Sequence, residues 1–328
     1  MIKFNNVIFS FKNLSINNKK KKNERGTITI RNFSELMIKA EKEDIKRLAV
    51  AVAGDKEVLE AVKLAHQKEL VSPILIGDKE KIRTIAAEIK LDLAQIKLIE
   101  AKDNREACQE AVRLISSGKG DILMKGLVGT STIMKAVLNE EYGLATGRLI
   151  SHIAMVESSA LDRLVFVTDG GMNIKPDLEE KKQIIQNAIE AANQLGFEKP
   201  RVAVMAAVEK VNSQMSETLD AAVLTKMSDR GQIKGAVIDG PLALDNALSK
   251  EAARIKGLES PVAGKADILL VPEIVAGNLL GKSSVYFAED DIATIIGGTS
   301  HPIVLTSRAN TARIKLISIA ATVLMASN

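Results

Sequence analysis

The residues best suited to chemistry lie near the end of the chain, where Ser307 and Arg308 follow the apolar run 303–305. A guanidinium binds a phosphate through two parallel N–H groups, a geometry that lysine does not offer. The serine hydroxyl can donate to the same anion. A helical pattern begins at about residue 309, so the pair also lies where a helix cap would. The corner therefore has two interpretations, a cap and a phosphate site.

A second candidate anion site lies within "MKGLVGTSTIMKAV", residues 124–137. Thr130 and Ser131 stand where a strand-like run gives way to a helical one, and Lys135 follows about one turn later. Hydroxyls and free backbone N–H groups at a helix N-terminus bind anions. The spacing matches neither the phosphate loop of nucleotide hydrolases nor the dinucleotide pattern G-x-G-x-x-G. A simple N-cap is the alternative interpretation.

Three further strand ends carry polar side chains. Asp169 precedes two glycines, and a turn closed by its own carboxylate explains it as well as substrate binding does. Asp239 precedes a Gly-Pro pair and could act as an acid or a base. Asn278 and Lys282 are four residues apart in a helical pattern, so they share one face, which is either solvated or turned to a substrate. Ligands of open α/β sheets bind at strand ends, so these residues join the candidate site.

The elements that must position these residues alternate between apolar, strand-like runs and helical patterns. Strands are predicted at 47–53, 73–77, 96–101, 121–126, 149–156, 163–168, 201–208, 235–240, 267–272 and 291–298. Helices are predicted at 56–70, 79–90, 104–118, 131–139, 173–197, 213–230, 245–256, 274–287 and about 309–326. The runs 149–156 and 163–168 leave no room for a crossover helix, so an antiparallel pair is expected there. The rest of the pattern predicts an α/β fold with a mostly parallel sheet.

Composition excludes several classes of function. The net charge of +4 comes from residues 1–25, which carry seven basic residues and one acidic residue. Residues 1–26 are expected to form a disordered basic arm, and the rest of the chain has no basic excess, which argues against nucleic-acid binding. No apolar run reaches 18 residues, so no membrane partner is expected and the cytoplasm is the default location. Cys108 lies in a helical pattern and is interpreted as a buried core residue.

Six longer stretches around the candidate residues resemble the phosphate acetyl/butyryltransferase family, in particular its butyryl branch. They are "DILMKGLVGTSTIMKAVLN", "GLATGRLISHIAMVE", "RLVFVTDGGMNIKPDLEEK", "RGQIKGAVIDGPLALDNALSKEAA", "VAGKADILLVPEIVAGNLLGKSSVYFA" and "PIVLTSR". The resemblance covers roughly residues 35 to 326. Its most specific parts are "DGPLALDNA" and the run from "ADILLVP" to "AGN".

The resemblance implies a reversible transfer of a short acyl group, butyryl or branched, between CoA and inorganic phosphate. It implies no metal and no cofactor, the CoA thioester being a substrate, and acyl phosphate as the other product. The implied fold has two α/β domains, similar to isocitrate and isopropylmalate dehydrogenases, with a cleft between them. Residues 27–150 with 302–328 would form the first domain and 151–301 the second. A homo-oligomer built from dimers is also implied.

The resemblance also implies roles for individual residues. Ser307 and Arg308 match a pair that, in the acetyl branch, binds the phosphoryl group and steadies the CoA sulfur. Thr130 and Ser131 match phosphate-loop hydroxyls, and Lys135 matches a basic position beside them. Direct attack in a ternary complex, with no covalent enzyme intermediate, is what the family suggests.

The sequence departs from the family pattern just after Ser307. Ile314 stands where the acetyl branch has an acid that acts as a base towards CoA, and Asn310 and Arg313 replace two acids of the butyryl branch. Gly281 stands where an aromatic residue is common. The base is therefore unassigned, with Asp239 as the candidate. An acetyl-transferring enzyme and a protein that binds acyl-CoA or acyl phosphate without turnover are the alternative functions.

Overall fold

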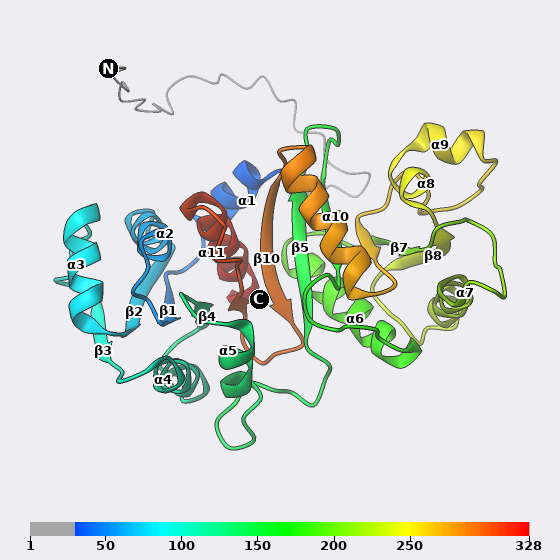
Figure 1. Cartoon of the computed structure of the whole chain (residues 1–328). Helices are drawn as coiled ribbons and strands as arrows, with labels where there is room; N and C mark the ends of the chain where they lie inside the picture. Colours follow the sequence, from blue (N-terminus) through cyan, green and yellow to red (C-terminus); the bar gives the residue numbers. More distant parts are fainter. Residues whose placement is uncertain (1–29, 328) are drawn as a thin grey trace.

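The computed structural model describes residues 30–327, which form a mixed α/β fold on one continuous sheet of eleven strands (Figure 1). The basic segment 1–26 lies outside the described residues. In order across the sheet, the strands are β3 (Lys97–Glu100), β2 (Val71–Gly77), β1 (Lys46–Ala51), β4 (Ile122–Lys125), β11 (Ile303–Val304), β10 (Asp291–Gly297), β5 (Ser151–Glu157), β6 (Leu164–Thr168), β9 (Ile268–Leu270), β7 (Arg201–Met205) and β8 (Val237–Leu242).

Helices cover both faces of this sheet, as the alternating pattern predicts. They are α1 (Phe33–Ala40), α2 (Lys56–Gln67), α3 (Lys79–Ile89), α4 (Asn104–Ser116), α5 (Thr130–Val137), α6 (Leu178–Gln194), α7 (Ser216–Asp229), α8 (Leu244–Leu248), α9 (Lys250–Ile255), α10 (Ile274–Phe287) and α11 (Ala312–Ala326). Within residues 30–327, no helix has the length and apolar character needed to cross a membrane.

The sheet is mostly parallel, with its exceptions in the middle. The strands from β3 to β11 are parallel to one another, and so are those from β6 to β8. Between these two blocks, β10 is antiparallel to both β11 and β5, and β5 is antiparallel to β6. The antiparallel pair predicted for 149–156 and 163–168 is therefore confirmed.

The end of the chain returns to its first half. The short strand β11 pairs with β4, and α11 packs against α1 and α2. α11 is buried along nearly its whole length, which explains why its sequence is apolar on every side. This return carries the loop between β11 and α11 to the carboxyl end of β4, and so to the start of α5 (Figure 1).

Several predicted boundaries differ from the observed ones. The predicted helix 245–256 is two short helices, because Ser249 ends α8 and its hydroxyl caps α9 by accepting a hydrogen bond from the N–H of Ala252 at 3.2 Å. The predicted helix 173–197 begins only at Leu178, where Asp177 and Glu180 form a capping box. α1 was not predicted. Cys108 lies fully buried in α4, as expected, and burial raises the pKa of its thiol to about 11.

Candidate functional site

A cavity of about 310 Å³ lies over the middle of the sheet, between α10 and the loop that follows β11. It brings together four of the predicted site residues, which are Thr130, Asn278, Lys282 and Ser307. Apolar side chains of β5, β6, β10 and the segment after β11 form much of its wall: Ala154, Val167, Ile292 and Leu305. Loops from both halves of the sheet therefore meet around one space that has a polar end and an apolar wall.

Ser307 and Arg308 lie in the loop between β11 and α11, and neither caps the helix. The N-cap of α11 is Thr311, whose side chain accepts a hydrogen bond from the N–H of Ile314. The N–H of Ser307 instead donates to Oδ1 of Asn310 at 2.7 Å, which closes the loop. Arg308 is exposed and makes no hydrogen bond or ion pair with the described residues. The cap interpretation is therefore wrong for this pair. Oγ of Ser307 accepts a hydrogen bond from the N–H of Ala309 at 3.4 Å, so its hydroxyl proton and the guanidinium of Arg308 are the groups available to a ligand.

The guanidinium of Arg308 lies beside the N-terminus of α5. A Cβ placed on Gly129, the N-cap of that helix, would lie 3.9 Å from Nη2 of Arg308 and equally far from Oγ of Ser131. Gly129 supplies no side-chain cap and the first turn of α5 contains no acid. The N–H of Thr132 donates to the carbonyl oxygen of Gly129 at 3.1 Å, which leaves the N–H groups of Thr130 and Ser131 without a partner among the described residues. The helix dipole adds partial positive charge there. Helix end, hydroxyls and guanidinium together are suited to hold an anion, and we call them the phosphate end of the cavity (Thr130, Ser131, Ser307 and Arg308). Thr130 and Ser307 line the cavity itself, and Ser131 and Arg308 lie beside it, around Gly129.

Lys135 is not part of this site. It lies in the last turn of α5, is exposed, and does not line the cavity.

Two buried lysines, which the sequence reasoning missed, stand behind the phosphate end. Lys125, at the end of β4, is only 4% exposed, and its Nζ donates to the carbonyl oxygens of Val128 at 3.3 Å and Gly126 at 3.4 Å. Burial, together with the charges of Arg308 and Lys315, lowers the pKa of Lys125 to about 8. The sequence does indicate this residue, because Lys125 directly ends the apolar run in "DILMK", where a buried strand is predicted.

The second buried lysine, Lys315, holds the loop of Ser307 from below. Its Nζ donates to the carbonyl oxygen of Ser307 at 3.3 Å and to that of Asn310. Burial lowers the pKa of Lys315, while the nearby carboxylates of Asp55 and Glu57 oppose this shift. Two cations, Arg308 and Lys315, therefore lie in or against the loop of Ser307, and Lys125 lies against the loop before α5. This arrangement favours a multiply charged anion between the two loops.

Asp169 shapes the loop after β6, which lines the cavity with Gly170 and Gly171, without facing the cavity itself. Its carboxylate is 2% exposed and does not belong to the cavity lining. It accepts hydrogen bonds from the backbone N–H groups of His152, Gly171, Met172 and Asn173 and from Nδ2 of Asn173, at 2.7–3.3 Å. With five donors on one carboxylate, Asp169 fixes the loop after β6 and leaves little capacity for a substrate.

The loop that Asp169 fixes rests directly on α10. A Cβ added to Gly170 would lie 2.7 Å from the carbonyl carbon of Gly277, so only glycine allows this approach. The amide of Asn278 donates to the carbonyl oxygen of Gly170 at 3.4 Å. Asn278 and Lys282 are exposed and both line the cavity, so they share one face, as their spacing predicts, and that face is turned to the cavity.

Asp239 lies outside the cavity and far from the phosphate end. It is on the edge strand β8, six strands from β11 in the sheet order, which corresponds to roughly 30 Å at the usual strand spacing. Its Oδ1 accepts a hydrogen bond from the N–H of Gly240 at 2.9 Å, so it serves its own turn. The structure does not bring Asp239 to the cavity, and we drop it as a candidate base.

The three residues after Ser307 that differ from the family pattern make contacts of their own in the structure. Ile314 is buried in the main hydrophobic core. Arg313 forms an ion pair with Asp291, with 2.7 Å between Nη2 and Oδ2. Asn310 lines the cavity but uses its side-chain oxygen to hold Ser307. None of the three positions supplies a carboxylate to the cavity.

Comparison with known proteins identifies the family. A model of the family described as phosphate acetyl/butaryl transferase matches residues 32–113 and 104–323, which together span most of the chain. The chain belongs to this family. Members of this family are acyltransferases. Several of the stretches that carried the resemblance contribute residues to the cavity, whereas "DGPLALDNA" lies on β8 and α8, away from it.

Individual relatives cover nearly the whole chain. A phosphate butyryltransferase of Clostridium beijerinckii is 49% identical over 296 residues, 90% of this chain and 98% of the relative. A phosphate butyryltransferase of Clostridium acetobutylicum is 47% identical over 299 residues, 91% of this chain and 99% of the relative. The crystal structure of a branched-chain phosphotransacylase from Enterococcus faecalis is 31% identical, with a TM-score of 0.75, and covers 86% of this chain and 99% of that chain.

Proposed function

We propose that the chain is a phosphate butyryltransferase that moves a short acyl group, butyryl or branched, between CoA and inorganic phosphate. The observation that carries the proposal is the position of Arg308 beside the unpaired N-terminus of α5, at the edge of a cavity with an apolar wall. The two butyryltransferase relatives, both 47% or more identical, support the choice of acyl group.

Phosphate binds at the phosphate end in this proposal. The N–H groups of the first turn of α5 and the hydroxyls of Thr130 and Ser131 donate to phosphate oxygens, while Arg308 grips two of them in parallel. Ser307 donates to the same group or to the CoA sulfur beside it. The buried charges of Lys125 and Lys315 add a positive field without touching the anion.

The acyl chain lies against the apolar wall of the cavity. Side chains from three neighbouring strands, Ala154, Val167 and Ile292, form a surface that a short alkyl chain covers. Gly281 of α10 lines the same space, and a Cβ there would meet only Cδ1 of Ile292, at 3.4 Å. The absence of a side chain at this position leaves room for more than an acetyl group.

The chemistry is a direct exchange of one acyl bond for another. A phosphate oxygen attacks the thioester carbonyl, the C–S bond breaks, and CoA leaves with its sulfur pair. Donors at the phosphate end are positioned to stabilise the charge that develops. The enzyme contributes no covalent intermediate, and the proposed reaction takes no cofactor beyond the CoA thioester that is its substrate.

Domain organisation, assembly and location are further parts of the proposal. Residues 27–150 with 302–328 form one domain and 151–301 the other, and the packing of α11 on α1 and α2 supports this division. The protein is a cytoplasmic homo-oligomer built from dimers. An interface between copies is supported by the exposed apolar side chains of α10, which include Val275, Leu279 and Phe287.

A thiol-detection assay with phosphate and a series of acyl-CoA substrates tests the function. We expect CoA release that depends on phosphate and is faster, in kcat/KM, with butyryl-CoA or isobutyryl-CoA than with acetyl-CoA. A preference for acetyl-CoA would reassign the protein to the acetyl branch. Tight acyl-CoA binding without any phosphate-dependent release would leave only a binding role.

A further inference from the structure

Two buried polar atoms on the cavity wall have no hydrogen-bond partner among the described residues. They are Nδ1 of His152, on β5, and Oγ1 of Thr306, just after β11. Both residues line the cavity. Buried polar groups are nearly always paired in folded proteins, so two unpaired ones around one space indicate that a bound molecule completes them.

His152 is the group on this wall with the properties of a base. Among the described residues that line the cavity, none is an aspartate or a glutamate. Imidazole is the side chain that gains and loses a proton near neutral pH. The ring of His152 donates or accepts no hydrogen bond within residues 30–327, whereas its backbone N–H donates to Oδ2 of Asp169 at 3.1 Å.

The surroundings of His152 keep its ring neutral. Burial lowers the pKa of His152, and the carboxylate of Asp169 opposes this shift only in part. The other charged group that faces the same space is Lys282, which lines the cavity from α10. A neutral imidazole has one nitrogen without a proton, which is the form that a proton acceptor requires.

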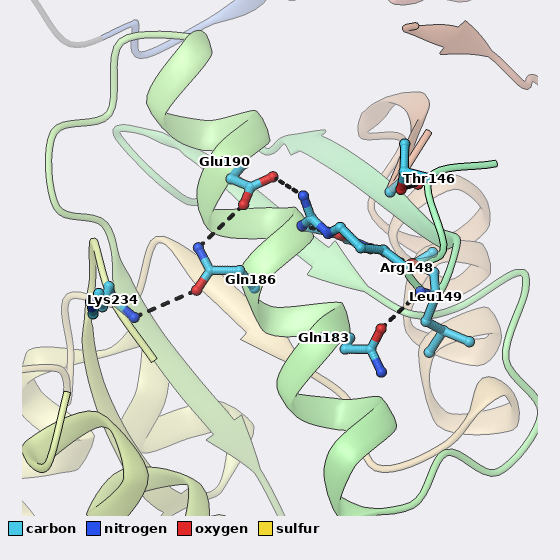
Figure 2. A network of polar contacts seen from close by, with 10 residues as sticks. Thr146, Arg148, Leu149, Gln183, Gln186, Glu190 and Lys234 are labelled. Atoms are coloured by element: carbon cyan, nitrogen blue, oxygen red, sulfur yellow. Dashed lines mark hydrogen bonds and ion pairs between the residues drawn. The ribbon is translucent and has the colours of Figure 1, made fainter. Parts of the chain in front are cut away.

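The ring is also held in one place. A Cβ added to Gly171 would lie 2.9 Å from Cγ of His152, so the imidazole rests on the backbone of the loop after β6. Just before β5, the N–H of Leu149 donates to Oε1 of Gln183 at 2.9 Å and Arg148 pairs with Glu190 at 2.8 Å (Figure 2). These bonds fasten the start of β5 to α6 and fix the strand position from which His152 reaches the cavity.

We propose that His152 is a catalytic residue that accepts the proton of the CoA thiol. This step rests on the proposed function and supplies the base that Ile314, Asn310 and Arg313 do not. In the direction of acyl-CoA synthesis, the S–H bond breaks and its proton passes to the free ring nitrogen of His152. The sulfur pair bonds to the acyl carbon, and the C–O bond to phosphate breaks with its electrons staying on phosphate. In the opposite direction, the imidazolium returns the proton to the departing thiolate.

His152→Gln tests this role, because the amide fills similar space but does not titrate. We expect kcat for acyl-CoA synthesis from butyryl phosphate and CoA to fall by roughly 10²-fold or more at pH 7. The CoA thiol ionises unaided with a pKa of about 8.5, so the deficit should shrink about tenfold per pH unit between about pH 7 and 8.5. A purely structural role predicts a deficit that does not change with pH.

His301→Gln is the matched control. Burial also lowers the pKa of His301, but that residue lies in a different cavity, so the variant should keep wild-type rates. A rate for His152→Gln within about threefold of wild type, or a deficit that is the same at every pH, overturns the proposal. If the variant does not fold, the dependence of wild-type kcat on pH decides. The proposal requires kcat for acyl-CoA synthesis to fall at acid pH with the titration of one group in the histidine range. A kcat that does not change with pH rejects His152 as the base. Failure of the wild-type enzyme to turn over at all would count against the function instead.

Discussion

Two parts of the cavity, the phosphate end and the wall that carries His152, handle charge in opposite ways. At the phosphate end, the exposed Arg308 and the open N-terminus of α5 stand in front of two buried lysines, so positive charge accumulates. On the wall of the cavity, the neutral ring of His152 has a buried Nδ1 and no hydrogen-bond partner among residues 30–327. A multiply charged anion that enters and leaves requires fixed positive charge at an open edge. A proton that moves over a short distance requires a dry, neutral acceptor in a fixed position.

The phosphate end and the wall that carries His152 are also built from different kinds of secondary structure. Loops and a helix terminus form the phosphate end, where side chains can adapt to a ligand that binds from solvent. A central strand of the sheet carries His152, and hydrogen bonds to α6 fix the segment that leads to it (Figure 2). Substitutions at the phosphate end should therefore affect phosphate binding, whereas substitutions on the wall should affect proton transfer and the fit of the acyl chain.

Removing the guanidinium should have the largest effect at the phosphate end. We expect Arg308→Ala to lower kcat/KM for phosphate by about 10²-fold or more, because the charge clamp on the anion is lost. Arg308→Lys should recover only part of this, since it restores the charge but not the paired N–H geometry. Initial rates over a range of phosphate concentrations measure both. Near-normal kinetics for Arg308→Ala would show that this loop does not bind phosphate.

Filling the acyl space should change specificity rather than phosphate binding. We expect Gly281→Phe to lower the ratio of kcat/KM for butyryl-CoA to that for acetyl-CoA by roughly tenfold or more, because the ring occupies the room for the longer chain. KM for phosphate should change little. Competition between the two thioesters gives the ratio directly. An unchanged ratio would place the acyl chain elsewhere.

Neutralising a buried lysine should have a smaller effect that depends on pH. We expect Lys125→Met to raise KM for phosphate at pH 7 by roughly three- to tenfold, as expected for losing one nearby charge at moderate screening. In the wild type, Lys125 loses its proton as the pH rises through about 8, so KM for phosphate should rise above that pH. The variant should lack this rise.

Lys125→Met weakens phosphate binding in this account, but it should not weaken the folded state of the protein. The folded-state pKa of Lys125 is lowered, so the folded protein disfavours the charged lysine, and Lys125→Met should not reduce the temperature of unfolding at pH 7. Calorimetry provides the check. A marked loss of stability would mean that the bonds of Nζ to Gly126 and Val128 outweigh the burial of its charge.

The smallest effect is expected at Lys135. This side chain is exposed in the last turn of α5 and lies outside the cavity, so Lys135→Ala should keep kcat/KM for phosphate within about twofold of wild type. It has the same charge as Lys125 and serves as its control. A large loss would require the phosphate to lie along α5 rather than at its N-terminus.

Much of the fold was predictable because hydrophobic periodicity is a local property. The alternation of apolar runs and helical patterns located every strand longer than two residues and the antiparallel pair in the middle. β11 has only two residues, too few for any period, and α8 and α9 merge into one pattern because the break at Ser249 is a cap rather than a change in hydrophobicity. Such features depend on tertiary contacts.

The site was less predictable, because strand order and orphaned atoms are properties of the whole fold. The loops that contain Thr130 and Ser307 could be found from their residue types alone. The distance of Asp239 from them could not, because only the order of the strands shows that β8 lies six strands from β11. His152 sits in an ordinary strand pattern, and nothing local indicates that its ring lacks a partner. Buried lysines leave a weak signal, a single charge at the end or in the middle of an apolar run.

The most direct test of the account is to observe the phosphorylated product. Phosphorus NMR of the enzyme with butyryl-CoA and inorganic phosphate should show a new acyl phosphate signal that grows in step with free CoA thiol. Arg308→Ala should slow the growth of this signal by about 10²-fold or more at equal enzyme concentration and subsaturating phosphate. Thiol release without an acyl phosphate signal would mean that water, not phosphate, takes the acyl group. That result would contradict the claim that the end of α5 and the loop of Ser307 hold phosphate for transfer.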